Sequence, residues 1–248
     1  MTTQTPEATT RICSQGKTKT LYYTTDPHYL VMEFRDDTTA FDGSKKESLT
    51  DKGAVNNAFN AHMMQLLARQ GIPVHLDKRL DERRSLVQKL QMIPLEAVLR
   101  NISTGSLCRR LGVDEGLTLQ PPIFEFFYKD DDRGDPMVNE SHAITFGWAT
   151  SEQMQQMQQI CVRVNDILKA EFARGGLQLV DYKLEFGTDG NGRIVLGDEL
   201  TPDSARIWRL QDGKKMDKDR FRQNLGSVVE SYREVAESLN IEGLPQLL

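Results

Sequence analysis

The sequence predicts a mixed fold of two lobes, α+β or α/β. Residues 16–42 carry β-rich runs separated by a turn signal, and residues 151–173 repeat apolar side chains at helical spacing. Residues 179–187, "LVDYKLEFG", alternate almost perfectly between apolar and charged side chains, which is typical of a strand with two different faces. Because strands come first and a mixture of strands and helices follows, we expect a β-rich lobe and a mixed lobe.

The composition is that of an ordinary globular chain. Its 248 residues are 38% hydrophobic and 27% charged, enough for one large domain or two small ones that share a cleft. Lysine and arginine are spread along the chain and the net charge is −5, so we expect no nucleic-acid partner. No window is apolar enough to span a bilayer. The first ten residues contain no apolar segment, so we expect them to fray and to be neither a signal peptide nor a membrane anchor.

Cysteine and histidine usage narrows the possible metals. The three cysteines are odd in number and far apart, so they form no zinc or redox pair, and a reducing cytoplasm fits them best. The four histidines are also scattered along the chain. Any bound metal is therefore expected to be a hard cation held by oxygen ligands.

The N-terminal third is predicted to hold strands followed by a helix. The runs "KTKTLYYT" and "YLVMEFRDD" are predicted strands, and "DPH" between them is a turn signal. Four apolar residues at helical spacing predict a helix over residues 52–70, which Gly71 and Pro73 end.

The segment "SLVQKLQMIPLEAVLRN" is predicted to form two extended runs broken at Pro94. We place the seam between the lobes near Met92–Pro94. This seam divides the chain into a β-rich lobe, residues 1–93, and an α+β lobe, residues 94–248, which ends in a helix.

The C-terminal half is predicted to combine helices with a hairpin. Thr150 and Gln153 form a capping-box pattern in front of the helix over residues 151–173. Residues 179–187 and 193–198 form a hairpin, because the linker "TDGNGR" contains two turn signals. A last helix is predicted from Asp217 onward, with an apolar face formed by Phe221, Leu225, Val228, Tyr232 and Val235.

The stretch "GKTK" places Lys17 and Lys19 on the same side of a strand, directly after a glycine. Two ammonium groups there could contact two phosphate oxygens as point charges. The spacing is not that of a Walker loop. Two solvated lysines on an edge strand are the alternative interpretation.

The stretch "PLEAVLRNISTGSL" combines an arginine with a predicted helix start. Glu96 and Arg100 flank an extended apolar run, and hydroxyls with a glycine, including Ser106, open a short helix, "SLCRRL". Free N–H groups at a helix start favour anions, and arginine can clamp a phosphate or carboxylate with two hydrogen bonds. A helix cap beside a surface arginine is the alternative.

The loop "KDDDRGDPMVNE" concentrates acidic residues. Asp135 precedes a proline, so it could be held rigidly and serve a metal ion or an amine. A solvated turn is the alternative.

The predicted hairpin gathers charge on one face. With the hairpin centre near Gly190–Asn191, Asp198 lies opposite or diagonal to Lys183 and Glu185. Asp181, Glu185 and Asp198 are therefore candidate Mg²⁺ ligands, because Mg²⁺ typically binds one or two carboxylates plus phosphates and water. Lys183 among these acids would keep its charge and could bridge a phosphate. A half-buried strand with a solvated face is the alternative.

Two long segments carry a resemblance to a known family. "IPLEAVLRNISTGS" and "LVDYKLEFG" resemble the two signature segments of the SAICAR synthetases, the phosphoribosylaminoimidazole-succinocarboxamide synthases. "GKTK", "DDTTAFDG", "GDPMVNE" and "LGDELTPDSARIW" occur in the family's order and approximate spacing. The resemblance covers nearly the whole chain after the first ten residues or so.

The resemblance implies an enzyme of de novo purine synthesis. A SAICAR synthetase joins the carboxylate of carboxyaminoimidazole ribonucleotide (CAIR) to the amine of L-aspartate, and it cleaves ATP to ADP and phosphate with Mg²⁺. The implied fold has a nucleotide lobe of antiparallel strands, related to ATP-grasp and kinase-like lobes, and a larger α+β lobe, with ATP between them. A homodimer is compatible with the family, although no interface can be identified in the sequence.

The resemblance also implies roles for individual residues. Contacts with the ATP phosphates are implied for Lys17 and Lys19, contacts with the adenine for Lys89 and Met92, partly through the backbone, and a nucleotide contact for Lys129. Lys183 is implied to stabilise the transferring phosphoryl group. Metal ligands are implied to be Glu185 and Asp198 on ATP, with Glu96 and Asp135 at the CAIR carboxylate. CAIR contacts are implied for Arg100, Ser106, Asp203, Arg206 and Arg222. The catalytic set is Lys183, Asp135 and Arg100, with Asp135 as the hypothetical acceptor of the amine proton.

Three other functions stay open at this point. They are a small-molecule kinase on a similar lobe, a carboxylate–amine ligase for another amino acid, and a non-catalytic nucleotide-binding module. A kinase would release ADP without an amine. A non-catalytic module would tolerate replacement of the acidic face and of Lys183 without loss of function.

Overall fold

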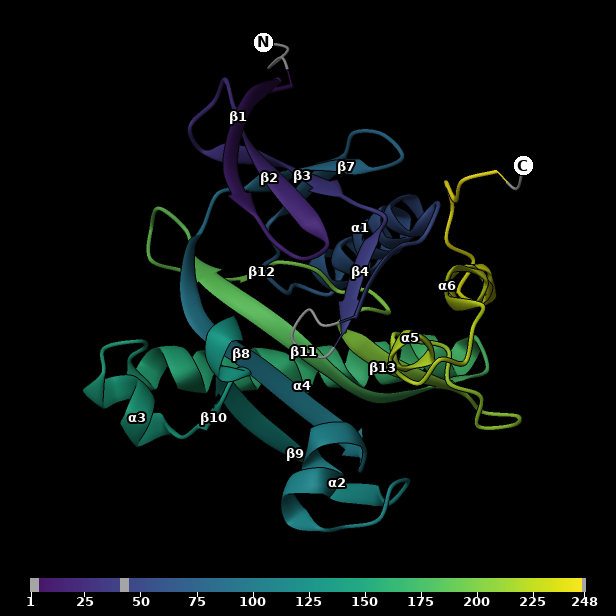
Figure 1. The fold of residues 1–248 in the computed structure, drawn as a ribbon. Coiled ribbons are helices and arrows are strands. Elements are labelled where there is room, and N and C mark those ends of the chain that lie inside the picture. The colour runs from purple at the N-terminus through teal and green to yellow at the C-terminus, as the bar shows by residue number, and fades with distance from the viewer. Residues whose placement is uncertain (1–4, 41–44, 247–248) are drawn as a thin grey trace.

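The computed structural model describes residues 5–40 and 45–246, and its N-terminal part is an antiparallel sheet of order β1-β2-β3-β7-β6 (Figure 1). The strands are β1 (Ala8–Gln15), β2 (Lys19–Thr24), β3 (Tyr29–Phe34), β6 (Leu76–Arg79) and β7 (Arg84–Gln88). The two strands predicted around "DPH" are confirmed. The expected fraying of the first ten residues is wrong from Ala8 onward, because β1 pairs with β2, and residues 1–4 lie outside the described residues.

A second, larger antiparallel sheet has the order β10-β9-β8-β11-β12 and lies below the first in Figure 1. Its strands are β8 (Gln91–Ile102), β9 (Thr118–Tyr128), β10 (Met137–Val138), β11 (Leu177–Thr188), β12 (Ile194–Gly197) and β13 (Ala205–Arg209). β12 and β13 pair with the C-terminal and N-terminal halves of β11, respectively. A separate hairpin joins β4 (Asp37–Ala40) to β5 (Lys45–Ser48), and the end of the "DDTTAFDG" segment lies outside the described residues.

Helices cover both sheets, and the longest, α4 (Ser151–Arg174), crosses behind β8 and β11 and packs against them (Figure 1). Its start is fixed by a capping box. Thr150 Oγ1 accepts from the Gln153 N–H at 3.1 Å, and Gln153 Oε1 accepts from the Thr150 N–H at 2.9 Å. The predicted helix and its cap are therefore confirmed. The other helices are α1 (Lys52–Arg69), α2 (Gly105–Leu111), α3 (Glu140–Thr145), α5 (Asp219–Arg222) and α6 (Val228–Ser238), with a 3₁₀ turn at Asp131–Arg133.

β11 runs through the main core, and its two faces divide apolar from charged side chains. The strand gives the core Leu177, Leu179, Tyr182, Leu184 and Phe186. The change of parity comes from a bulge, because the register with β13 passes from Leu179 directly to Asp181. Val180 is the extra residue, so the uniform alternation predicted from the sequence fails there. Beyond the bulge, Asp181, Lys183 and Glu185 share the face opposite the core.

The predicted break at Pro94 is wrong. β8 runs from Gln91 through Pro94, and the interruption after β7 falls at Lys89–Leu90. The register between β8 and β11 shifts between the pairs Glu185–Glu96 and Gly187–Met92, so Pro94 lies at an irregularity of the ladder. A proline is tolerated there because its missing N–H removes no regular ladder bond.

The single helix predicted from Asp217 onward is also wrong. The chain forms α5 and α6 with a break between them, and Asn224, Gly226 and Ser227 in the break have positive φ angles. Leu225 is 47% exposed and does not belong to a buried face. The backbone of these residues cannot continue a right-handed helix, so the helix is interrupted, although Phe221, Val228 and Tyr232 pack in one buried cluster across the break.

The predicted fold class is confirmed as a mixed α+β architecture built on antiparallel sheets. The boundary after residue 93 stays a prediction, and it falls within β8. Among residues 5–40 and 45–246, no helix is long and apolar enough to cross a membrane.

Candidate active site

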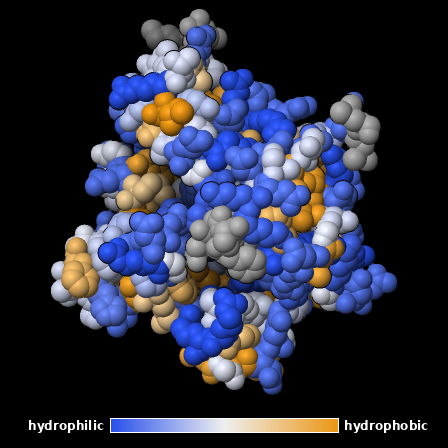
Figure 2. Space-filling view, in the orientation of Figure 1, coloured by the Kyte–Doolittle hydropathy of each residue, from blue (hydrophilic) through white to orange (hydrophobic). Residues whose placement is uncertain are grey.

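A charged cleft of about 580 Å³ lies between the start of β2 and the charged face of β8 and β11. A more apolar cavity of about 380 Å³ adjoins it along the first sheet and the link from β7 to β8. The two spaces share five lining residues, Gly16, Lys19, Lys129, Glu185 and Asp198, so they form one continuous cleft. In the view of Figure 2 most of the molecular surface is hydrophilic, with separate apolar patches.

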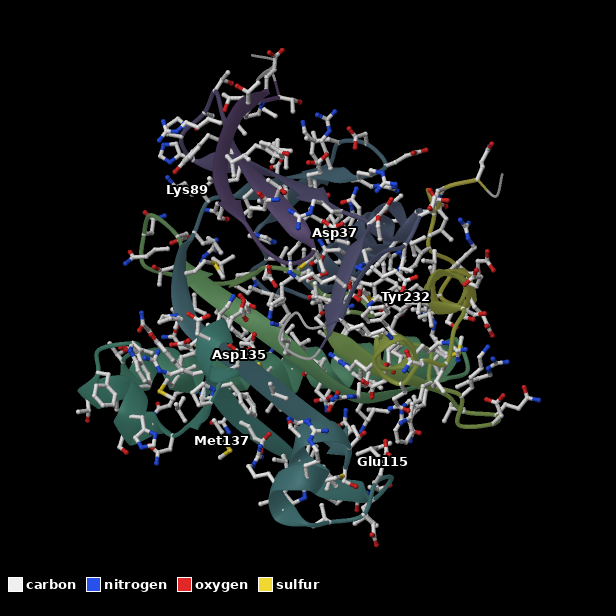
Figure 3. The ribbon with its side chains drawn as sticks, viewed as in Figure 1. Asp37, Lys89, Glu115, Asp135, Met137 and Tyr232 are labelled. Atoms are coloured by element: carbon white, nitrogen blue, oxygen red, sulfur yellow. The ribbon has the colours of Figure 1, made fainter. Side chains whose placement is uncertain are left out.

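The apolar end of the cleft brings together the two residues predicted to face adenine. Lys89 and Met92 both line it, together with Leu21, Leu30, Met32 and Val87. The Lys89 ammonium lies 5.4 Å from the centroid of the Tyr23 ring, beside the first sheet (Figure 3). The Lys89 backbone N–H donates to the His28 carbonyl at 2.8 Å, so that N–H is already used within the protein.

Lys19 lies where the two parts of the cleft meet. Its Nζ is 2.6 Å from Asp198 Oδ1 and 2.6 Å from Glu199 Oε1. Burial alone would lower the pKa of Lys19, but the two carboxylates outweigh burial and raise it, so the ammonium stays charged. Lys17 lies before β2 and pairs with Asp131 at 2.9 Å, so the two lysines do not share one side of a strand as predicted.

Lys183 is surrounded by carboxylates, as its place in the sequence predicted. Its Nζ contacts Glu96 and lies 3.1 Å from Glu185 Oε1, and Lys129 contacts the other oxygen of Glu185. Burial opposes the charge on Lys183, but Glu185, Glu96 and Asp198 raise its pKa well above the usual value. Burial raises the pKa of Glu96, which Lys183 partly offsets. The cleft therefore holds a permanent cation among acidic groups.

The register of the hairpin differs by one residue from the predicted one. Glu185 pairs with Gly197, so Asp198, just beyond the end of β12, comes level with Leu184 and lies neither opposite nor diagonal to Lys183 or Glu185. Asp198 has a φ of 52° and Asp135 has a φ of 49°, a left-handed backbone that costs a non-glycine residue about 1–2 kcal/mol. Both carboxylates line the charged cleft, and Asp135 lies next to β8 in Figure 3. Strained backbone at these two positions is typical of functional sites.

Two arginines meet at Asp181. Arg100 Nη1 lies 2.7 Å from Asp181 Oδ2, and Arg206 Nη1 lies 2.8 Å from the same oxygen. Arg100 also donates to Glu125 at 2.9 Å and to the Ser106 hydroxyl at 3.2 Å. Asp181 is thus an ion-pair partner of the two arginines. The periodicity of the strand had suggested instead that Asp181 is a metal ligand.

Gly105, at the start of α2, allows Arg206 to approach. A Cβ atom at this position would lie 2.5 Å from Arg206 Nη2, and its φ of +60° is accessible to glycine. The glycine in "STGS" therefore has a packing role beside the arginine pair.

Asp203 lines the cleft, and its buried carboxylate contacts residues of α1 and α6. Its carboxylate pairs with Lys52, accepts from Asn56 Nδ2 at 2.9 Å, and accepts from the Tyr232 hydroxyl at 2.7 Å. The predicted contact of Asp203 with CAIR stays a prediction, and its position in the lining of the charged cleft is compatible with it. Arg222 lines the same cleft and pairs with Asp219.

Four residues that the sequence reasoning gave no role belong to the site or support it: His75, Glu199, Asp217 and Lys218. Burial lowers the pKa of His75 to about 4 and that of Lys218 to about 8, the latter opposed by Asp203. Burial and the neighbouring Asp219 raise the pKa of Asp217 to about 7. Their roles could not be predicted from the charge of their side chains, because these roles depend on burial by segments that are distant in the sequence.

The donor set fits a magnesium ion that is shared with a nucleotide. In the described part of the chain, no three His, Cys, Asp or Glu side chains form a cage for a metal ion. Glu185 and Asp198 both face the junction of the two spaces and offer only oxygen donors. Mg²⁺ usually binds through one or two carboxylates plus substrate phosphates, so two such residues are sufficient.

Comparison with known proteins identifies the family. The SAICAR synthetase family model matches residues 12–239. The chain belongs to the SAICAR synthetase family. Phosphoribosylaminoimidazole-succinocarboxamide synthase of Idiomarina loihiensis is 59% identical over 92% of this chain and 95% of its own, and that of Nitrosococcus oceani is 57% identical over 91% and 94%.

Solved structures of the family share the fold. Phosphoribosylaminoimidazole-succinocarboxamide synthase from Ehrlichia chaffeensis superposes with a TM-score of 0.92 at 38% identity, over 94% of this chain and 100% of that chain. A SAICAR synthetase (Type-2) in complex with ADP gives a TM-score of 0.91 at 40% identity, over 96% of this chain and 100% of that one.

Proposed function

We propose that this chain joins the carboxylate of CAIR to the amine of L-aspartate at the expense of ATP, giving SAICAR, ADP and phosphate in de novo purine synthesis. The observation that carries the proposal is the 59% identity, over 92% of the chain, to a relative named for this reaction. The cleft supports it, because an apolar end joined to a charged end suits a nucleotide and anionic substrates.

The apolar end would take the base, with Lys89 and Met92 against it. The phosphates would then lie at the junction, near Lys17, Lys19 and Lys129. A relative that was solved with ADP supports this assignment of the nucleotide. Because Lys19 and Lys129 are paired with carboxylates in the cleft, phosphate oxygens would exchange with or share these existing partners.

The first chemical step would be phosphoryl transfer. An oxygen of the CAIR carboxylate attacks the γ-phosphorus of ATP, ADP leaves, and a carboxyl phosphate forms. Lys183 would stabilise the charge that moves through the transferring group, because it keeps its proton and lies beside Glu96 and Glu185. Arg100, Ser106, Asp203, Arg206 and Arg222 would orient the ribonucleotide.

The second step would be attack by the aspartate amine on the activated carbonyl carbon, with phosphate as the leaving group. The amine must be neutral to attack and must lose a further proton as the amide forms. Asp135 is the proposed acceptor, since its carboxylate lines the cleft. The nucleophile belongs to the substrate, so no serine or cysteine nucleophile is needed.

Mg²⁺ is the proposed cofactor, and two positions are proposed for it. Glu185 and Asp198 would hold Mg²⁺ on the nucleotide, and Glu96 and Asp135 would hold Mg²⁺ at the CAIR carboxylate. When bound, it would neutralise phosphate charge and align the phosphates. A homodimer and a cytoplasmic location stay predictions.

One assay separates this reaction from its alternatives. ADP release over many turnovers is measured with CAIR, Mg²⁺ and L-aspartate, omitting each in turn, and we expect sustained release only when all three are present. ADP release at full rate without L-aspartate would indicate a kinase. Full activity with a different amino acid in place of L-aspartate would indicate another ligase, and AMP as a product would exclude the proposed chemistry.

A further inference from the structure

His75 is a buried histidine to which the reaction above assigns no role. It lies in the link between α1 and β6, with 6% of its surface exposed. This link runs beside β12, because the Leu196 N–H donates to the Pro73 carbonyl and the His75 N–H donates to the Leu196 carbonyl, both at 2.9 Å. His75 thereby reaches the apolar end of the cleft, where Asp198 is also part of the wall.

The imidazole makes a directed contact with the main chain of Asp198. His75 Nε2 lies 2.9 Å from the Asp198 carbonyl oxygen. Because a carbonyl oxygen can only accept, Nε2 must carry the hydrogen, and this fixes the tautomer of the ring. The contact involves no carboxylate, so the imidazole acts on the backbone of Asp198 and leaves its charge free for other partners.

The backbone that His75 contacts is the strained one. Asp198 has a φ of 52°, and such a conformation persists only where the surrounding structure holds it. Its carbonyl belongs to the peptide plane that joins Asp198 to Glu199, the two residues whose carboxylates share Lys19 at 2.6 Å each. Holding this plane therefore constrains ψ of Asp198 and φ of Glu199, two of the backbone angles on which the positions of both side chains depend.

We infer that His75 is a positioning residue for Asp198. By donating to the Asp198 carbonyl, it holds the left-handed turn that directs the Asp198 carboxylate toward the magnesium–nucleotide. The inference rests on the proposed function, because that function supplies the magnesium–nucleotide. It assigns His75 no contact with substrate and no proton transfer.

The test is the magnesium dependence of ADP binding to the full chain. The dissociation constant of ADP is measured by calorimetry with Mg²⁺ and with EDTA, for the wild type, His75→Leu and His75→Gln. Leucine removes the donor, whereas a glutamine amide can present a donor near the position of Nε2. We expect His75→Leu to reduce the ratio of the dissociation constant in EDTA to that in Mg²⁺ by about tenfold. A misdirected Asp198 carboxylate would lose one charged contact with the magnesium–nucleotide, and a contact of that kind has about this size. His75→Gln should keep the ratio within about threefold of the wild type, a small part of that contact.

Two controls separate positioning from a general loss of stability. Ile72→Ala removes a buried side chain from the same link, so it should lower the melting temperature and leave the ratio unchanged. Asp198→Asn should abolish most of the magnesium effect by itself, and adding His75→Leu to it should cause no further change. Should His75→Leu not fold, His75→Met takes its place, because it also lacks a donor.

The outcomes are distinguishable. If the wild type shows the magnesium effect and His75→Leu retains it, or weakens ADP equally with and without Mg²⁺, the positioning role is wrong and the proposed function stands. If the wild type binds ADP equally well in both conditions, the magnesium assignment and the positioning role fail together.

Discussion

The two ends of the cleft are built from different kinds of interaction. The apolar end is walled by aliphatic side chains such as Leu30 and Met92. At the charged end, by contrast, Lys19, Lys183 and Arg100 already contact carboxylates within the protein. A base can therefore enter one end by covering apolar surface, whereas a phosphate or carboxylate entering the other end joins an existing network of charges.

This difference determines how each end responds to mutation. In a network of buried charges, removing one member leaves its partners unpaired and desolvated, which costs far more than the lost contact. At an apolar wall, removing a side chain costs only the surface that it covered. We therefore expect large effects on turnover and folding at the charged end and small effects on affinity at the apolar end.

The largest effect is expected at Lys183. Lys183→Ala should lower kcat by about 10³-fold, the loss typical of a removed group that stabilises transition-state charge. The circular dichroism spectrum should stay unchanged, because a third of the lysine side chain is exposed. Lys129→Ala is the matched control, since it contacts the same Glu185 from a more exposed position, and its effect should be much smaller. Wild-type turnover in Lys183→Ala would remove this residue from the mechanism.

A comparable effect, on folding, is expected at Arg100. Arg100→Met leaves Glu125 and Asp181 with one arginine partner fewer in a buried site, so the free energy of unfolding should fall by about 3 kcal/mol. Guanidinium unfolding monitored by fluorescence measures this change. Arg110→Met removes the more exposed partner of Glu125 and should cost about 1 kcal/mol or less. Equal losses in the two variants would contradict the distinction.

The comparison also shows which parts of the molecule the sequence could predict. The β11–β12 hairpin depends on a period of two and on local turn residues, so its existence was predictable, although its register differs by one residue from the predicted one. The start of α4 depends on Thr150 and Gln153, which are neighbours in the sequence. Such features are determined by residues that are close in the sequence, so they can be predicted from it.

The features that escaped prediction depend on distant segments. The bulge at Val180 follows from pairing with β13, and the pairing of Lys19 with Glu199 joins residues 180 positions apart. Periodicity indicated that Asp181 faces a charged surface, but only the folded chain shows two arginines there. The roles assigned to single site residues came from the family resemblance, and they stay predictions.

A smaller effect is expected in the pH dependence of stability, through Asp217. Its pKa is about 7 in the folded chain and 3.8 when unperturbed, because burial and Asp219 oppose its charge. Between these values the unfolded chain binds fewer protons at this group, so its contribution to stability falls as pH rises from about 4 to 7. Asp217→Asn should flatten this slope in melting temperatures measured from pH 5 to pH 7. A slope as steep as that of the wild type would refute the shifted pKa.

The smallest effect is expected at the apolar end. Met92 lines the cavity and is 45% exposed, so Met92→Ala removes a limited contact area and should weaken ADP by about 1 kcal/mol, or about fivefold. The loss should be the same with Mg²⁺ and with EDTA, because the contact involves no charge. Met137→Ala is the matched control, since Met137 is 50% exposed on β10, away from Lys89 in Figure 3, and it should leave ADP affinity unchanged. A magnesium-dependent loss in Met92→Ala would mean that the two ends of the cleft do not act independently, because a change in apolar contact would then have altered the position of the phosphates.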